Sequence, residues 1–234
     1  MRRDDYLHTL CGTNAGMYDQ AAAQARELGF EYCAFGLKLP LPLAEPKIVL
    51  MNDYPALWSK RYESQGYLGV DPVVAHGLSS NEPILWSPAL FRSAGRLWDD
   101  ANAHGLNHGI GLARRLENGS VGMLNLSRSA DPINLLEAKE LLGEIEMLTE
   151  MLIVTEARIA TQRHLPEAHI SLNAREKEIL RWTADGKTSS EVGQILSLSS
   201  ATVNFHVNKA LKKLNAVNKM QAVVKAIVLG LLDF

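Results

Sequence analysis

The sequence has few cysteines, no long apolar run and almost no net charge. Cys11 and Cys33 are its only cysteines among 234 residues. Both have apolar neighbours and no metal-ligand spacing, so we expect reduced packing residues rather than a disulfide. No apolar run approaches the roughly 18 residues that a membrane span needs, and the first residues lack the apolar core of a signal peptide. These absences predict a cytoplasmic protein that does not associate with membranes.

Residue patterns of the common enzyme classes are also missing. There is no Ser-His-Asp spacing, glycine-rich phosphate loop or His/Cys metal set, and the seven histidines are scattered. His104 and His108 are four residues apart, but Gly105 and Gly109 would interrupt a helix that brings them together. We therefore predict no catalytic residues, no metal and no cofactor.

Charge is divided unequally along the chain. The net charge of −2 argues against nucleic-acid binding, yet residues 170–234 alone hold 9 Lys and Arg against 5 Asp and Glu. With 47% hydrophobic residues, two packed cores are expected. A polar segment with a proline, 164–170, separates the two parts. We predict an α+β chain with a ligand-binding and dimerisation domain over 1–163, a linker over 164–170 and an all-α domain over 171–234.

The last quarter of the chain predicts four short helices. Thr188 and Glu191 form a capping box at the start of the second helix, and Ser199 or Ser200 is placed to cap the third. Asn173 with Glu176 frames the first helix, and Asn218 with Gln221 frames the fourth. The apolar positions of the second helix are Val192, Ile195 and Leu196.

The third helix, to about Leu214, has one apolar stripe and one polar face. Val203, Val207, Ala210 and Leu214 recur at helical spacing, and Asn204 and Asn208 are predicted to lie opposite them. A short helix, a tight turn and such a helix indicate a helix-turn-helix. Asn can pair with adenine and Lys with phosphate, although a merely solvated face would have the same composition. The candidate DNA-binding residues are Lys187, Thr188, Thr202, Asn204, Asn208, Lys209 and Lys212.

Residues 172–215 resemble the DNA-binding domain of LuxR-type regulators. The similarity covers Leu-Asn-Ala-Arg-Glu-Lys-Glu-Ile-Leu from 172, Thr-Val-Asn-Phe-His-Val from 202 and Lys-Lys-Leu-Asn from 212. The family's landmark residues match Glu176, Leu180 and Gly186. The resemblance implies double-stranded DNA as a partner.

The N-terminal part predicts helices and strands in an uneven order. Helices are expected within 4–29, 53–62, 70–79 and 91–104, and strands over 30–39, 48–51, 83–86, 109–112 and 121–127. A turn at 117–119 predicts a hairpin. This order predicts an α/β/α sandwich with a mixed or antiparallel sheet.

A long helix is expected from 132 to 162. Its apolar stripe would consist of Leu135, Leu142, Ile145, Leu148, Leu152 and Ile159. Met147, Met151 and Ile153 lie off this line. The stripe fits an intramolecular core, and the extra apolar residues would fit burial against a second copy.

An aromatic cluster with one carboxylate lies within residues 50–128. It consists of Tyr54, Trp58, Tyr62, Asp71 and Trp86. Aromatic side chains mostly fill cores, but a carboxylate in apolar surroundings needs a hydrogen-bond donor because its burial costs several kcal/mol. The cluster is therefore a candidate binding site.

Tyr-Pro-Xaa-Xaa-Trp at 54–58, Asp71-Pro72, Trp86 and Gly109 resemble the acyl-homoserine-lactone-binding domain of LuxR-type quorum-sensing receptors. The resemblance implies that Asp71 accepts from the ligand amide N–H and that Trp58 donates to the lactone carbonyl. Tyr54 and Ser127 would bind the amide carbonyl. The expected ligand is an N-acyl homoserine lactone, and the expected ligand-binding residues are Tyr54, Trp58, Tyr62, Asp71, Val73, Trp86, Phe91, Gly109 and Ser127.

The sequence departs from this family at two places. Gly111 stands where many relatives have Thr or Ser, which would widen the acyl pocket or remove a contact to a 3-oxo group, and Ala113-Arg114-Arg115 replaces a more apolar stretch. Both leave the acyl specificity open. The expected partners are a second copy of the chain, an inverted-repeat DNA site and RNA polymerase. Two alternatives remain: a regulator that answers to another molecule or to none, and a lactone-hydrolysing enzyme with Asp71 as base.

Overall fold

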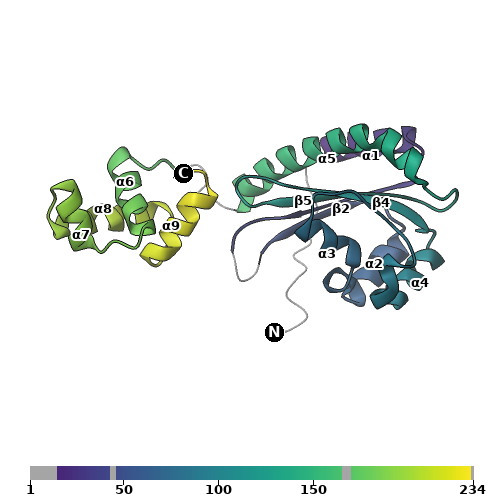
Figure 1. Cartoon of the computed structure of the whole chain (residues 1–234), viewed down its shortest axis with the longest axis horizontal. Coiled ribbons are helices and arrows are strands. Elements are labelled where there is room, and N and C mark those ends of the chain that lie inside the picture. The colour runs from purple at the N-terminus through teal and green to yellow at the C-terminus, as the bar shows by residue number, and fades with distance from the viewer. Residues whose placement is uncertain (1–14, 43–45, 165–169, 233–234) are drawn as a thin grey trace. The chain divides into compact units, whose positions relative to one another are not determined.

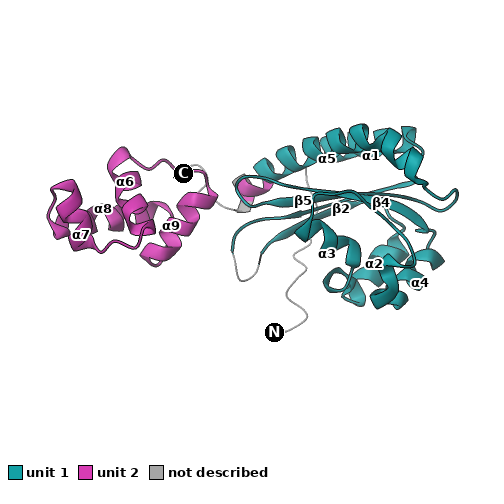
Figure 2. Cartoon of the chain, in the orientation of Figure 1, with its two compact units in different colours: residues 1–159 teal, residues 160–234 magenta. Residues whose placement is uncertain are grey.

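The chain forms two compact units, residues 1–159 and 160–234 (Figure 2). The computed structural model describes residues 15–42, 46–164 and 170–232. Most of the predicted linker, the start of the first predicted helix and Cys11 lie outside these residues, whereas Cys33 is a buried free thiol. No helix of the described residues is long and apolar enough to cross a membrane.

The N-terminal unit contains a five-stranded sheet. Its strands are β1 (Tyr32–Lys38), β2 (Ile48–Asn52), β3 (Ile84–Leu85), β4 (His108–Arg115) and β5 (Val121–Arg128). They lie in the order β2-β1-β5-β4-β3, and each neighbouring pair is antiparallel. The sheet is therefore antiparallel rather than mixed. The predicted β4–β5 hairpin is confirmed, with Gly119 at φ +82° in its turn, a conformation that glycine adopts without strain.

Helices cover both faces of this sheet (Figure 1). One face carries α1 (Ala15–Glu27) and α5 (Leu135–His164). The other carries α2 (Ala56–Ser64), α3 (Pro72–Ser79) and α4 (Gly95–Ala103), with the short 3₁₀ helices η1 (Tyr67–Gly69) and η2 (Leu90–Ala94). The segment predicted as one helix over 91–104 begins as η2 and becomes α-helical only at Gly95. The α/β/α sandwich is confirmed.

The buried side of α5 differs in part from the predicted stripe. Ile145, Leu148 and Leu152 are buried as expected and Leu142 and Ile159 are partly buried, but Leu135 is 72% exposed and Ile153 is fully buried. The cause lies in the sheet: a Cβ added at Gly122 of β5 would lie 2.2 Å from Cγ1 of Ile153. The glycine gives Ile153 its space, a contact that helical periodicity alone does not reveal.

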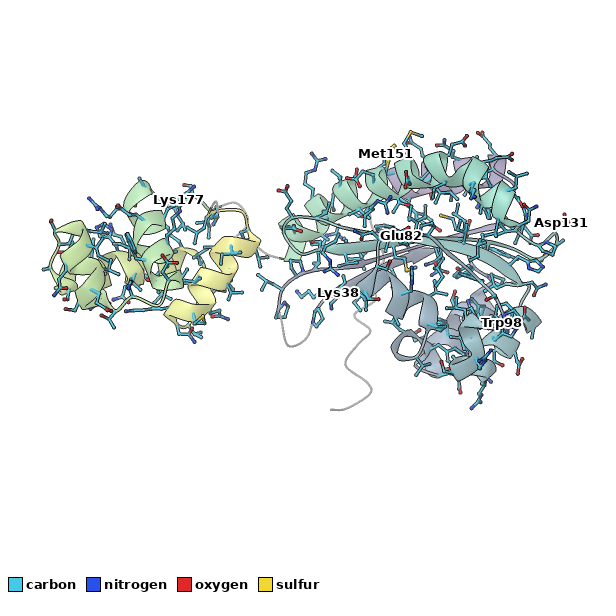
Figure 3. All side chains as sticks on the ribbon, viewed as in Figure 1. Lys38, Glu82, Trp98, Asp131, Met151 and Lys177 are labelled. Atoms are coloured by element: carbon cyan, nitrogen blue, oxygen red, sulfur yellow. The ribbon has the colours of Figure 1, made fainter. Side chains whose placement is uncertain are left out.

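The outer side of α5 remains apolar. Met147, Met151 and Val154 are all exposed there, and Figure 3 shows Met151 on the side away from the sheet. The expectation that Met147 and Met151 lie outside the intramolecular core is confirmed.

The C-terminal unit consists of four helices, α6 (Ala174–Ala184), α7 (Ser189–Leu196), α8 (Ser200–Lys213) and α9 (Lys219–Val228). The capping boxes at Asn173 and Thr188 are both present, each with Glu three residues later. Ser199, not Ser200, caps α8, and Asn218 caps α9. These caps satisfy backbone N–H groups that helix starts leave unpaired, so the four boundaries follow closely from the sequence.

The core of the C-terminal unit includes the whole predicted stripe of α8, Val203, Val207, Ala210 and Leu214. Ile195, one of the apolar positions of α7, lies outside this core and is 44% exposed. Helix α7 instead packs through Val192 and Gly193, and a Cβ on Gly193 would lie 2.7 Å from the carbonyl oxygen of Leu198. This close approach turns Ile195 outward.

A buried ion pair joins α6 to α8. Glu176 is 1% exposed, and its Oε2 lies 2.7 Å from Nζ of Lys213. Lys213 also donates to the carbonyl oxygen of Ser171 at 3.0 Å. Burial alone would raise the pKa of Glu176, but the bond and charge of Lys213 and the bond from the Asn173 amide outweigh it and lower the pKa. Glu176 therefore stays ionised inside the unit.

Candidate functional site

The sheet face toward α2, α3 and α4 is here called the inner face. The side chains that the central strands turn toward it are mostly small and are here called the floor. Directly paired residues of neighbouring strands point to the same face. Three rows cross β1, β5 and β4 on this face: Tyr32–Ser127–Gly109, Ala34–Asn125–Gly111 and Gly36–Met123–Ala113. The β1 members of these rows are only partly buried, although β1 is not an edge strand.

Aromatic side chains from four helical segments stand over this floor. Trp58, Tyr67 and Phe91 are buried in one cluster with Val73, and Tyr54, Tyr62, Trp86 and Trp98 pack against it. The structure thus brings together the predicted aromatic residues, which are spread over almost 40 positions of the sequence. Gly109 has a steric role, because a Cβ there would lie 2.4 Å from the Trp86 ring.

Asp71 is the carboxylate of this cluster and has the donors that its burial requires. It caps α3, accepting from the backbone N–H of Val73 at 2.8 Å, and its second oxygen accepts from the Tyr62 hydroxyl at 2.9 Å. Burial nevertheless raises the pKa of Asp71, because it outweighs these hydrogen bonds. Burial also raises the pKa of Tyr62, with a further contribution from the Asp71 charge.

Several polar atoms around the same floor have no hydrogen-bond partner within the described residues. They are Oγ of the fully buried Ser127, Nε1 of Trp86 and Oδ1 of Asn125. Trp58 is a buried residue, and no described residue accepts a hydrogen bond from its indole N–H. Tyr54 lies near Ser127, but the two hydroxyls do not form a hydrogen bond of normal geometry. Burial raises the pKa of Tyr54, and the Ser127 hydroxyl opposes this shift only in part. Unpaired buried polar atoms are uncommon and concentrate where ligands bind.

The sequence reasoning missed Tyr67, Trp98 and Asn125. Tyr67 stacks on Trp58 at 6.2 Å between ring centroids, and Trp98 lies 4.8 Å from Phe91. Trp98 follows Phe91 by seven residues in a predicted helix, a spacing that places both on one side. Asn125 precedes Ser127 by two residues in a predicted strand, so strand alternation places it on the same face as Ser127, which the family resemblance had indicated.

The space beside Gly111 is not the wider pocket that its missing side chain had suggested. A Cβ at Gly111 would lie 2.6 Å from Oδ1 of Asn125, 2.8 Å from Cε of Met123 and 3.0 Å from Cγ1 of Val73. Neighbouring side chains therefore occupy the volume that Thr or Ser would fill. Arg114 and Arg115, further along β4, bind the C-terminal end of α3 and the residues after it. Arg115 donates to the carbonyl of Leu78 and Arg114 to that of Asn81.

The second candidate site is the exposed side of α8. Asn208, Lys209 and Lys212 are exposed there, as is Lys187 before α7. Asn204 is also exposed but lies at the flank toward α7, where its Oδ1 accepts from Ser189 Oγ at 2.7 Å. Its predicted position opposite the buried stripe is wrong, because one residue advances a helix by only about 100°. Thr188 and Thr202 use their hydroxyls within the caps of α7 and α8.

Phe205 is the residue that the sequence reasoning missed on this surface. Its side chain is 54% exposed near the centre of the outer face of α8. Nζ of Lys209 lies 4.6 Å from the centroid of its ring. The exposed aromatic ring was available in the sequence, two positions after Val203, but only the polar residues had been considered.

Two family models match the chain. The autoinducer binding domain model covers residues 13–154, and the model of bacterial regulatory proteins of the luxR family covers residues 170–226. The transcriptional activator protein SolR of Ralstonia nicotianae is 42% identical over 92% of each chain. The quorum-sensing regulator RhlR of Pseudomonas aeruginosa is 36% identical over 93% of this chain and 90% of its own.

Solved structures give the same result. A crystal structure of Escherichia coli SdiA matches with a TM-score of 0.79 and 35% identity, over 95% of this chain and 93% of that one. SdiA in complex with octanoyl-rac-glycerol matches with a TM-score of 0.78 and 33% identity, over 95% and 91%. The chain therefore belongs to the LuxR family of bacterial transcriptional regulators, among the members that combine an autoinducer-binding domain with a helix-turn-helix DNA-binding domain.

Proposed function

We propose that this regulator binds an N-acyl homoserine lactone on the inner face of its sheet and controls transcription through α8. The observation that carries the proposal is the buried, unpaired hydroxyl of Ser127 on a face that also carries Trp58 and the partly buried carboxylate of Asp71. An acyl homoserine lactone has one amide N–H, two carbonyl groups and an apolar tail. Its polar groups match this set one for one.

In the proposed complex each polar group of the ligand is paired with the protein. Asp71 accepts from the amide N–H, Trp58 donates to the lactone carbonyl, and Tyr54 with Ser127 donates to the amide carbonyl. The Tyr62 hydroxyl and the Val73 N–H already hold the Asp71 carboxylate in place. Because these donors are preorganised, the site loses little conformational entropy on binding. Trp86, Phe91 and Gly109 shape the surroundings of the head group.

Mass spectrometry of protein expressed with and without a panel of acyl homoserine lactones tests the ligand class. Recovery of intact lactone from the purified chain supports the proposal. Accumulation of ring-opened product would favour the lactone-hydrolysing alternative. Absence of any lactone, together with unchanged DNA binding, would favour a regulator that answers to another molecule or to none.

The proposed regulator acts as a homodimer on an inverted repeat. Met147, Met151 and Val154 expose apolar surface along α5, and Val217 and Met220 do so at the start of α9. Two-fold symmetric proteins present their recognition helices to half-sites about one helical turn apart. Light scattering at micromolar concentration, with lactone and operator DNA present, should give the mass of two chains per duplex. A single chain per duplex would contradict the dimer, and RNA polymerase would be a further partner of the DNA-bound form.

DNA contacts should divide between residues that read bases and residues that position the helix. Ser189 orients the side chain of Asn204 and leaves its NH₂ group free to donate to a base edge. Asn204→Ala should therefore cost about 1–3 kcal/mol on the selected operator and little on random DNA. Lys212→Ala should weaken both alike and lower the salt slope by about one. Fluorescence anisotropy at several salt concentrations measures both quantities.

Equal losses of Asn204→Ala on the operator and on random DNA would remove Asn204 from base readout. Lys177→Ala on α6, whose side chain Figure 3 places in the same unit outside α8, serves as the control for a general loss of positive charge. Lys177→Ala should leave the sequence preference unchanged, and it should not lower the salt slope by about one as Lys212→Ala does.

A further inference from the structure

Asn125 is a polar residue at the centre of the inner face without a hydrogen-bond partner. It lies on β5, the middle strand of the sheet. Its Oδ1 is buried and unpaired, and its amide nitrogen has no bonded partner among the described residues either. A buried amide oxygen without a donor destabilises the folded protein, so Asn125 calls for a bound group that pairs with its amide.

The immediate surroundings of Asn125 are small or apolar. In its own row and the next, the central strands contribute Ala34, Gly111, Gly36, Met123 and Ala113. Among the residues that β1, β5 and β4 contribute to these two rows, Asn125 is the polar one. Gly111 gives the amide its place, since a Cβ there would lie 2.6 Å from Oδ1 of Asn125.

The strand register relates Asn125 to the ligand. Under the proposed function, Ser127 and Tyr54 hold the amide carbonyl. Ser127 lies one residue before the end of β5 at Arg128, so along β5 the floor continues from it toward Asn125 and Met123. Side chains on one face of a strand follow at about 7 Å. An acyl chain that follows β5 from Ser127 therefore passes Asn125 within its first few carbon atoms.

We infer that Asn125 selects ligands whose acyl chain carries an oxygen at its third carbon. This inference rests on the proposed function and names the ligand class more narrowly. The third carbon is two bonds beyond the amide carbonyl carbon, which brings its oxygen within reach of the Asn125 amide. The Asn125 NH₂ group can donate to the oxygen of either a 3-oxo or a 3-hydroxy group, and a 3-hydroxy group can in addition donate to Oδ1. An acyl chain without an oxygen at its third carbon would leave the Asn125 amide facing methylene groups, without a hydrogen-bond partner.

Titration of the purified full chain with three lactones tests the inference. The probes are N-octanoyl-, N-(3-oxooctanoyl)- and N-(3-hydroxyoctanoyl)-L-homoserine lactone. The wild type should bind one or both of the oxygenated ligands about tenfold more tightly than the octanoyl lactone. Asn125→Leu, which keeps the branched shape without polar atoms, should bind all three within about twofold and hold the octanoyl lactone at least as tightly as the wild type.

The outcomes separate this inference from the proposed function. Equal affinity of the wild type for all three lactones, or a preference that survives in Asn125→Leu, would overturn the role of Asn125 while leaving the lactone site intact. No binding of any of the three would overturn both. Asn125→Ala repeats the test without added bulk if the Leu variant does not fold. Asn81→Leu makes the same chemical change at an exposed residue and should keep the wild-type preference.

Discussion

Asp71→Asn should weaken lactone binding by about ten- to a hundred-fold. The change removes the charge that accepts the ligand N–H, and hydrogen bonds to charged groups contribute about 1.5–3 kcal/mol. It should leave α3 in place, because Asn caps a helix as well as Asp and can still accept from the Val73 N–H. Competition binding measures the loss, and the thermal shift caused by lactone gives an independent reading.

The control for this prediction is Asp99→Asn, which neutralises an exposed carboxylate on α4. It should bind lactone as the wild type does. A melting temperature of Asp71→Asn that rises with lactone as much as that of the wild type would remove Asp71 from the site. Since burial raises the pKa of Asp71, the affinity of the wild type should begin to fall at a higher pH than an ordinary aspartate would give.

Lys213→Met should destabilise the C-terminal unit by about 1–3 kcal/mol at neutral pH. It leaves the carboxylate of Glu176 buried without its cation, and removal of one partner of a fully buried pair costs about 3–5 kcal/mol. Because the Lys213 side chain is 37% exposed, water screens part of the interaction and the expected value is smaller. Denaturant titration with hydrogen exchange of α6 peptides measures it, and Lys212→Met on the exposed side is the matched control.

The pH dependence of this difference has a definite sign. Lys213 holds the pKa of Glu176 below its ordinary value, so the pair stabilises the fold above the unfolded pKa of about 4.3. This contribution disappears as the pH falls through the folded pKa. The wild type and Lys213→Met should therefore differ most at neutral pH and converge in acid. Equal stability of Lys213→Met and Lys212→Met at pH 7 would contradict the role of the pair.

The sequence predicted most of what is locally determined. Caps such as Asn173 and Thr188 fix helix starts because their partners lie within three residues. Burial of Ile153 could not be predicted in this way, because it depends on Gly122, which lies on a different element. The position of Asn204 was wrong for a simpler reason: a residue directly after buried Val203 lies only about 100° around the helix, at the flank where Ser189 of α7 bonds Asn204.

The candidate ligand site was predicted through family resemblance more than through pattern. Tyr54, Trp58, Asp71 and Ser127 come together as the motif implied, although their roles toward a ligand remain predictions. Asn125 was missed because it does not belong to the motif. Its unpaired amide becomes conspicuous only when the strand register and the packing of Gly111 are known.

The close packing of Ile153 against Gly122 limits how the ligand specificity of this protein can be engineered. Successive residues of β5 face opposite ways, so Met123 and Asn125 border the proposed acyl chain while Gly122 touches α5. A library that randomised the whole strand would mostly return proteins unable to seat α5, since even one added methyl group at Gly122 meets Ile153 at 2.2 Å. Variation confined to alternate positions, 123 and 125, would explore new ligands while each clone keeps its helix in place.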